Sequence, residues 1–123
     1  MKSKIRAPAA LRPKIRILIG AVVAIGPGRA DLLQAIARTG SISAAARDMG
    51  MSYRRAWLLV EAVNAAFRSP LVETLTGGQG GGGARITEDG ERAIQLFWKF
   101  SEAFKRFIAK EQEKFSADAL FRK

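Results

Sequence analysis

Four consecutive side chains, Ser52, Tyr53, Arg54 and Arg55, can all form hydrogen bonds to anionic or base-bearing ligands. A guanidinium group can donate two bonds to guanine or phosphate, and serine and tyrosine hydroxyls can bond phosphate oxygens. Apolar residues at helical spacing follow the run, so it would form the first turn of a helix. Positive charge at the start of a helix is unfavourable for folding because it opposes the helix dipole. Two arginines at this place therefore indicate a role in binding and not in stability. The alternative interpretation is a solvated basic turn.

Other kinds of chemistry have little support in the sequence. The chain contains no Cys and no His, so it has no disulfide framework, no thiolate or imidazole metal ligand and no histidine general base. No nucleophile–base pair is visible, and we expect neither an enzyme nor a bound cofactor or metal. Residues 78–83 formally match the GxGxxG dinucleotide motif, but a strand-like segment follows them where that motif requires a helix. We interpret them as the tip of a hairpin.

The net charge of +10 indicates an anionic partner, either nucleic acid or a membrane surface. Residues 1–87 hold 13 basic and 4 acidic side chains, whereas residues 88–123 hold 8 and 7. The basic start before the apolar run 17–25 loosely resembles a signal peptide. That run is short and is interrupted by Gly20. Isoleucines at 15, 17 and 19 alternate with Arg16 and Leu18, so a strand is favoured over a signal peptide. No run is long enough to span a membrane, and we expect a cytoplasmic protein.

Hydrophobic periodicity and turn residues predict a mostly α fold with a small β wing. We expect a flexible basic arm over 1–13, strands over 14–20 and 22–25, a helix over 30–38 ended by Gly40, and a helix over 43–49 capped by Ser43. After a turn at Gly50, a helix capped by Ser52 covers 53–67, strands cover 71–76 and 84–87, and one long helix covers 88–114. The expected domains are 14–87 and 88–123.

The middle of this order has the spacing of a helix-turn-helix. Ala46 is small where two helices would touch, and Gly50 supplies the turn four residues later. The alternative is an ordinary pair of helices joined by a turn. We expect the hairpin after the second helix to act as a wing, with Gly80 at its tip and Arg85 at its base near phosphate.

The last helix carries an aromatic stripe of Phe97, Phe100, Phe104 and Phe107. Their spacing of three, four and three residues is typical of a coiled-coil seam. A second copy of the chain could cover the stripe, which predicts a homodimer with two recognition helices. The alternative is that the stripe packs on the first helix and N-terminal strands of the same chain.

Several of these segments together resemble a known family. Residues 32–36, 40–46, 51–57 and 64, followed by 70–72, the glycine loop and Ile86-Thr87-Glu88-Asp89-Gly90, look like the DNA-binding domain of ModE-type molybdate-responsive transcriptional regulators. The LysR-type DNA-binding domains are more distantly similar. The resemblance implies a winged helix-turn-helix that dimerises through its long helix and contacts DNA with the 52–55 turn. It implies that Trp57 packs inside. The molybdate-binding domain of that family is not found in this chain, so we expect no direct molybdate sensing.

We therefore expect a sequence-specific, homodimeric regulator of transcription that binds double-stranded DNA and has an unidentified effector. Two alternatives stay open: a non-specific, nucleoid-type DNA-binding protein and a winged-helix module that binds other proteins. The residues expected at the DNA are Ser43, Arg47, Ser52, Tyr53, Arg54, Arg55, Gly80 and Arg85.

Overall fold

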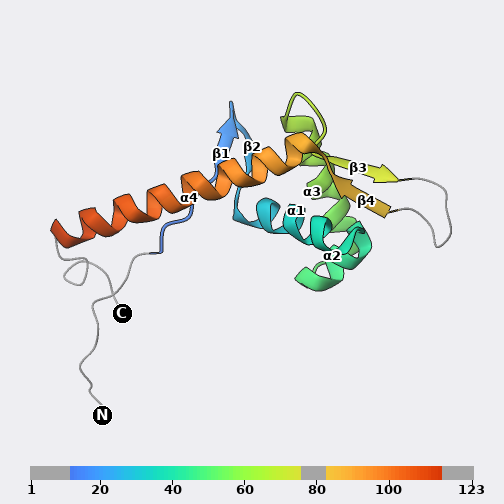
Figure 1. The fold of residues 1–123 in the computed structure, drawn as a ribbon, viewed down its shortest axis with the longest axis horizontal. Coiled ribbons are helices and arrows are strands. Elements are labelled where there is room, and N and C mark those ends of the chain that lie inside the picture. The colour runs from blue at the N-terminus through green and yellow to red at the C-terminus, as the bar shows by residue number, and fades with distance from the viewer. Residues whose placement is uncertain (1–11, 76–82, 115–123) are drawn as a thin grey trace, which may run out of the picture.

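A computed structural model describes residues 12–75 and 83–114 of the chain. In chain order the elements are β1 (Ile17–Ile19), β2 (Val22–Ile25), α1 (Pro27–Thr39), α2 (Ile42–Met49), α3 (Tyr53–Ala66), β3 (Val72–Leu75), β4 (Gly83–Ile86) and α4 (Glu88–Lys114) (Figure 1). Three helices and the β3–β4 hairpin form the body, and α4 runs across it and beyond. This arrangement confirms the predicted winged helix-turn-helix with a long C-terminal helix. Of the expected basic arm, only Arg12 and Pro13 lie within the described residues.

Strands β1 and β2 form an antiparallel hairpin, as predicted. Gly20 occupies the left-handed region at φ 64°, which a residue without Cβ adopts at little cost, and it turns the chain between the strands. The first strand is shorter than expected because its pairing with β2 begins only at Ile17. The register of the pairing shifts between Ile17 and Leu18.

Helix α1 forms the centre of the core. Its buried residues are Ala30, Leu32, Leu33, Ala35 and Ile36. The helix begins at Pro27, three residues before the predicted start, and Gly26 is its extended N-cap residue. Proline suits the first helical position because it lacks an N–H that would have no partner there and its φ is already helical. Gly40 ends the helix at φ 75°, as the sequence predicted.

Helix α2 is capped by a different serine from the one expected. The Ser41 hydroxyl accepts a hydrogen bond from the Ala44 N–H at 3.0 Å, so α2 begins at Ile42. Ser43 lies inside the helix, where a cap cannot form. Both serines are good capping residues, and Ser41 is the one with extended backbone that directs its hydroxyl at the first free N–H groups.

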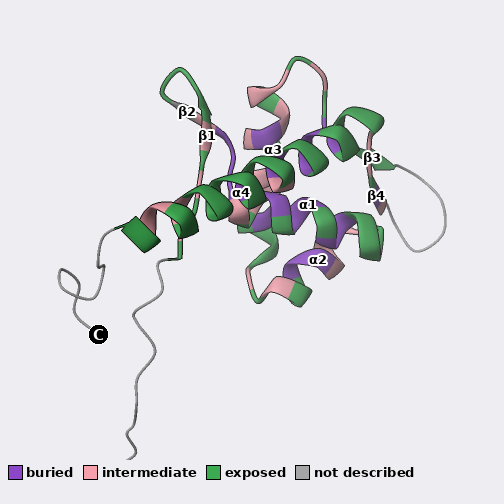
Figure 2. Ribbon diagram, turned by 60° about the vertical axis from the view of Figure 1, so that its left-hand side comes forward, coloured by how far each residue is buried: buried purple, intermediate pink, exposed green. Residues whose placement is uncertain are grey.

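Burial decreases along α4. Its buried residues are Gly90, Ala93, Ile94, Phe97 and Ser101, all in the first half of the helix. Figure 2 shows the purple positions of the molecule gathered where the helices of the body meet, whereas the last turns of α4 are largely green. The first half of α4 therefore belongs to the core, and the second half extends beyond it.

Candidate nucleic-acid interface

The α2–α3 pair has the tight turn that a helix-turn-helix requires. Gly50 adopts φ 68°, and the Met51 N–H donates to the Ala46 carbonyl at 3.0 Å, which closes the turn. Ala46 and Ala56 are both buried, and their small side chains allow α2 and α3 to approach each other closely. Met49 and Met51 are partly buried against the core, as expected for side chains that flank the turn. The fold thus fixes how α3 leaves α2.

The start of α3 is built as the sequence predicted. The Ser52 hydroxyl accepts a hydrogen bond from the Arg55 N–H at 3.0 Å and caps the helix. Tyr53 is 54% exposed, and its ring meets the Trp57 ring edge-on at 6.2 Å between centroids. Trp57 is half-buried and packs against the core, so it orients the tyrosine and does not itself face outward.

Arg54 and Arg55 are the two cations of this turn. Both are exposed, and neither side chain forms a hydrogen bond or ion pair with any residue in the described ranges. Three other arginines, Arg38, Arg85 and Arg92, lie beside a carboxylate. Since nothing in the described part of the chain offsets the Arg54 and Arg55 charges, this turn presents two unsatisfied cations to an external anion.

Ser43 and Arg47 lie together on the outer side of α2. The Arg47 Nη1 donates a hydrogen bond to the Ser43 hydroxyl at 3.1 Å, as residues four apart on a helix can. Arg47 is exposed and lies in the last turn of α2. The pair places one cation and one hydroxyl on the helix that precedes the Ser52–Arg55 turn. Their contact with phosphate stays a prediction.

The wing lies at the end of the molecule away from the last turns of α4 (Figures 1 and 2). Strands β3 and β4 pair antiparallel from Val72 opposite Ile86 to Leu75 opposite Gly83. Arg85 projects from β4 and donates two hydrogen bonds to one carboxylate oxygen of Glu73, at 3.0 and 3.1 Å. The predicted tip residue Gly80 lies outside the described residues.

Asn64 joins the wing to α3. Its amide oxygen accepts from the Leu71 and Val72 N–H groups at 2.8 and 3.1 Å, and its amide nitrogen donates to the Val72 carbonyl at 3.0 Å. The wing is thereby held at the end of the helix that carries Arg54 and Arg55. Sequence reasoning placed Asn64 only within the family resemblance and gave it no role. The available signal was a polar residue on the α3 face about two turns before a predicted strand, which could have predicted a hydrogen bond between the helix and that strand.

Two further contacts fix the wing. The Ala84 N–H donates to the Gly40 carbonyl at 3.0 Å, which attaches β4 to the α1–α2 turn. The Thr87 hydroxyl donates to the Pro70 carbonyl at 2.8 Å and accepts from the Gly90 N–H at 3.0 Å. Thr87 therefore caps α4 and joins the start of that helix to the start of the wing.

The aromatic stripe of α4 divides into two parts. Phe97 is 1% exposed and lies in the core of its own chain, so the expectation that it faces a second copy is corrected. Phe100, Phe104 and Phe107 are 46, 37 and 56% exposed. The last two rings stack at 6.5 Å with an interplanar angle of 17°. We call Phe100, Phe104 and Phe107 the aromatic seam.

The arrangement matches a known family over the segment that holds these elements. Residues 29–91 match the family described as bacterial regulatory helix-turn-helix protein, lysR family. The chain belongs to this LysR family. The matched segment begins within α1, includes the helix-turn-helix and the wing, and ends in the first turn of α4.

Individual relatives each match part of the chain. It is 49% identical over 73 residues to the molybdenum-pterin-binding protein MopA of Rhodobacter capsulatus, covering 59% of this chain and 28% of that protein. It is 49% identical over 71 residues to the DNA-binding transcriptional dual regulator ModE of Escherichia coli, covering 58% of this chain and 27% of that protein. The alignments therefore span less than a third of these relatives. A crystal structure of ArgP from Mycobacterium tuberculosis aligns with a TM-score of 0.48 at 16% identity, over 70% of this chain and 30% of that one.

No three His, Asp, Glu or Cys side chains in the described ranges are grouped so as to hold a metal ion. No helix in the same ranges is long and apolar enough to cross a membrane.

Proposed function

We propose that this LysR-family chain is a sequence-specific, DNA-binding regulator of transcription that acts in the cytoplasm as a homodimer. The observation that carries the proposal is the Ser52–Arg55 turn: a capped helix start with two exposed arginines that have no partner in the described ranges. The N-terminal turn of a recognition helix is the part that reaches base edges in the major groove. ModE is a DNA-binding transcriptional dual regulator, and this supports the part of the proposal that concerns DNA and transcription, although the alignment covers only 27% of that protein.

Each element has its own part in the proposed complex. Arg54, Arg55 and Tyr53 contact bases and adjacent phosphates in the major groove, with Ser52 at the phosphate backbone. Ser43 and Arg47 on α2 and Arg85 on the wing contact the backbone and set the orientation of α3. Since Asn64 ties α3 to the wing, both contacts are presented as one rigid unit.

The aromatic seam supports the homodimer. Three exposed phenylalanines lie on a helix whose last turns leave the body of the molecule, and apolar surface of this kind is stabilised by a partner. Two copies that pair along α4 would be related by a two-fold axis, which presents two recognition helices to a palindromic site.

Selection of bound duplexes from a random pool tests the proposal. We expect an enriched palindromic site, and we expect Arg54→Ala and Arg55→Ala each to weaken binding to it by about 1–3 kcal/mol. Arg106→Ala, which removes an exposed arginine from the second half of α4, is the matched control and should leave affinity almost unchanged.

The same experiment discriminates the two other functions. A pool without enrichment, together with equal affinity for every duplex and a steep salt dependence, would show a non-specific DNA-binding protein. Absence of binding at physiological salt would point to a protein-interaction module. Unchanged affinity of both arginine variants for the selected site would contradict the assignment of the Ser52–Arg55 turn.

A further inference from the structure

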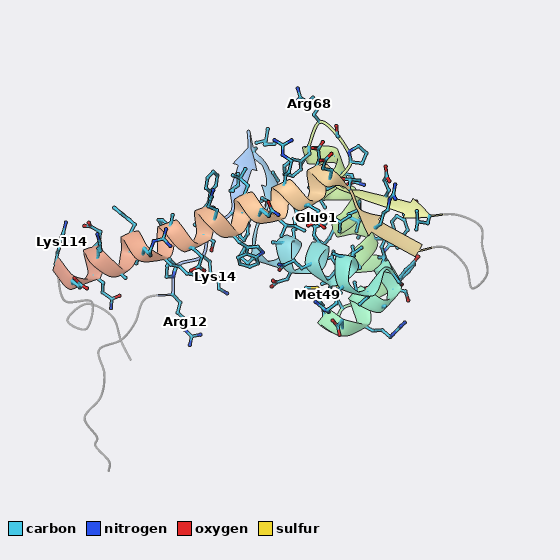
Figure 3. All side chains as sticks on the ribbon, viewed as in Figure 1. Arg12, Lys14, Met49, Arg68, Glu91 and Lys114 are labelled. Atoms are coloured by element: carbon cyan, nitrogen blue, oxygen red, sulfur yellow. The ribbon has the colours of Figure 1, made fainter. Side chains whose placement is uncertain are left out.

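We propose that the cavity beneath α4 binds a small aromatic carboxylate. The cavity has a volume of about 560 Å³, within the range of about 300–1,000 Å³ that is usual for small-molecule sites. It lies between the segment before β1, the first residue of α1 and the middle of α4, and Figure 3 shows Arg12 and Lys14 below that helix. Its described lining combines three cations, Arg12, Lys14 and Lys105, with Trp98, Ser101 and apolar carbon surface.

The charge of this lining favours an anion. Arg12, Lys14 and Lys105 are cations, and the described lining contains no carboxylate. Lys105 lies 3.4 Å from Glu102 on the outside of α4, whereas Arg12 and Lys14 form no ion pair with any residue of the described ranges. Three cations around one cavity repel one another, and a bound anion offsets that repulsion.

The wall also contains Trp98. Its indole Nε1 is buried and has no hydrogen-bond acceptor among the described residues. Buried polar groups are almost always paired, so an unpaired donor is unusual. The Phe97 ring meets the indole edge-on at 4.9 Å and limits its movement. The neighbouring Ser101, only 6% exposed, adds a hydroxyl to the same wall. A carboxylate oxygen is an acceptor for the Ser101 hydroxyl, and the Trp98 ring forms part of the same wall.

The rest of the wall requires an apolar body on the ligand. Pro13, Pro27, Ala109 and the Trp98 ring offer carbon surface, and such surface is stabilised when an apolar group displaces water from it. A bare inorganic oxyanion would leave most of the volume to water. An aromatic ring can cover these carbon surfaces while its carboxylate meets the cations, so the lining fits this class of ligand.

The cavity is separate from both proposed macromolecular contacts. At 3.6 residues per turn, Trp98, Lys105 and Ala109 lie on one side of the buried stripe of α4, and the aromatic seam lies on the other. The Ser52–Arg55 turn belongs to α3 and contributes nothing to the described lining. Ligand binding can therefore be measured without DNA, and its failure would leave the proposed function untouched.

The test is a titration of the full-length, ¹⁵N-labelled protein with sodium benzoate, followed through the tryptophan indole N–H signals by NMR. The chain has two tryptophans, so Trp57 in α3 is an internal reference. We expect the Trp98 signal to shift saturably, with a dissociation constant of about 1 mM or below, while the Trp57 signal stays in place. Arg12→Ala and Lys14→Ala should each weaken binding at least about five-fold by removing a charge partner.

Matched controls separate a built site from general attraction. Lys110→Ala removes an exposed α4 cation outside the described lining and should not change the titration. Neutral benzamide should give no saturable shift, and neither should sodium sulfate at the same ionic strength. The proposal is wrong if benzoate leaves the Trp98 signal unmoved, as it would where a second copy of the chain fills the cavity. It is equally wrong if benzamide or sulfate act like benzoate, or if Lys110→Ala matches Lys14→Ala.

Discussion

Arg85 has a carboxylate partner inside the chain, and in the proposed complex this partner would compete with DNA phosphate for the guanidinium. Its guanidinium donates to Glu73 across the wing, and both side chains are about half or more exposed. An exposed pair of this kind contributes only about 0–1 kcal/mol to folding. Glu73→Gln should therefore leave the fold intact and raise affinity for duplex DNA by about three-fold at low salt, because it frees Arg85 and removes a negative charge near phosphate.

Fluorescence anisotropy with a labelled duplex measures this change. Glu113→Gln removes one negative charge from an exposed position in the last turns of α4 and is the control for net charge alone. If both variants raise affinity equally, the effect is general electrostatics and Arg85 has no local contact with DNA.

Asn64 acts on stability through three hydrogen bonds from a single side chain. Asn64→Ala leaves the Leu71 N–H, the Val72 N–H and the Val72 carbonyl without this partner. Groups left unpaired in a partly buried place should lower the free energy of unfolding by about 2–3 kcal/mol. Asn64→Asp keeps the acceptor for both N–H groups, so its loss should be smaller.

Urea unfolding followed by circular dichroism measures both Asn64 variants. Gln34→Ala on the exposed side of α1 is the control for removing an amide side chain from a helix and should change stability by less than about 0.5 kcal/mol. A loss in Asn64→Ala no larger than the loss in Gln34→Ala would show that the amide does not hold the wing.

Among the elements, the junction between the wing and α4 depends on a glycine in a helix. A Cβ added at Gly90 would lie 2.4 Å from the Leu71 carbonyl oxygen and 2.6 Å from the Ile86 Cγ2. In most helices Gly→Ala is stabilising because alanine loses less backbone entropy on folding. Here the close approach of backbone prevails, and Gly90→Ala should lower the free energy of unfolding by about 1–3 kcal/mol.

Gly28 in the first turn of α1 is the matched control for Gly90. Nothing lies within 4 Å of a Cβ added there, and its φ is not in the left-handed region. Gly28→Ala should therefore be neutral or stabilising by up to about 1 kcal/mol. Thermal unfolding measures the stability of both variants. A stabilised Gly90→Ala protein would show that Gly90 does not pack closely against Leu71 and Ile86.

The elements also show which parts of the fold local sequence can predict. Gly40, Gly50 and Ser52 were identified because each acts through its own backbone conformation or a neighbouring N–H group. Ser41 and Ser43 are equally good caps by type, and the backbone at each position decides between them. The burial of Phe97 and Gly90 depends on how α4 crosses the body, which no local pattern contains.

At the scale of the whole molecule, the aromatic seam is the surface of α4 that the proposed homodimer would bury. Phe100, Phe104 and Phe107 are exposed in the single chain, so the fold of one copy does not need them. The double variant Phe100→Glu, Phe104→Glu should fold normally and yet be monomeric, because it places charges where two apolar surfaces would meet. Light scattering after size-exclusion chromatography measures the mass directly.

If two copies pair along α4 as proposed, loss of that dimer should also change how the protein binds DNA. With two recognition helices joined, the second half-site binds at high effective concentration, so the monomeric variant should lose about 100-fold affinity for a two-half-site duplex. Affinity for a single half-site should hardly change, since the Ser52–Arg55 turn is intact. Arg106→Glu, which alters charge more strongly on the opposite side of α4, should remain dimeric and bind both duplexes almost like the unmodified chain. If the Phe100→Glu, Phe104→Glu protein stays dimeric, the dimer interface does not lie on the aromatic seam. If the unmodified chain is monomeric, the proposed homodimer is wrong.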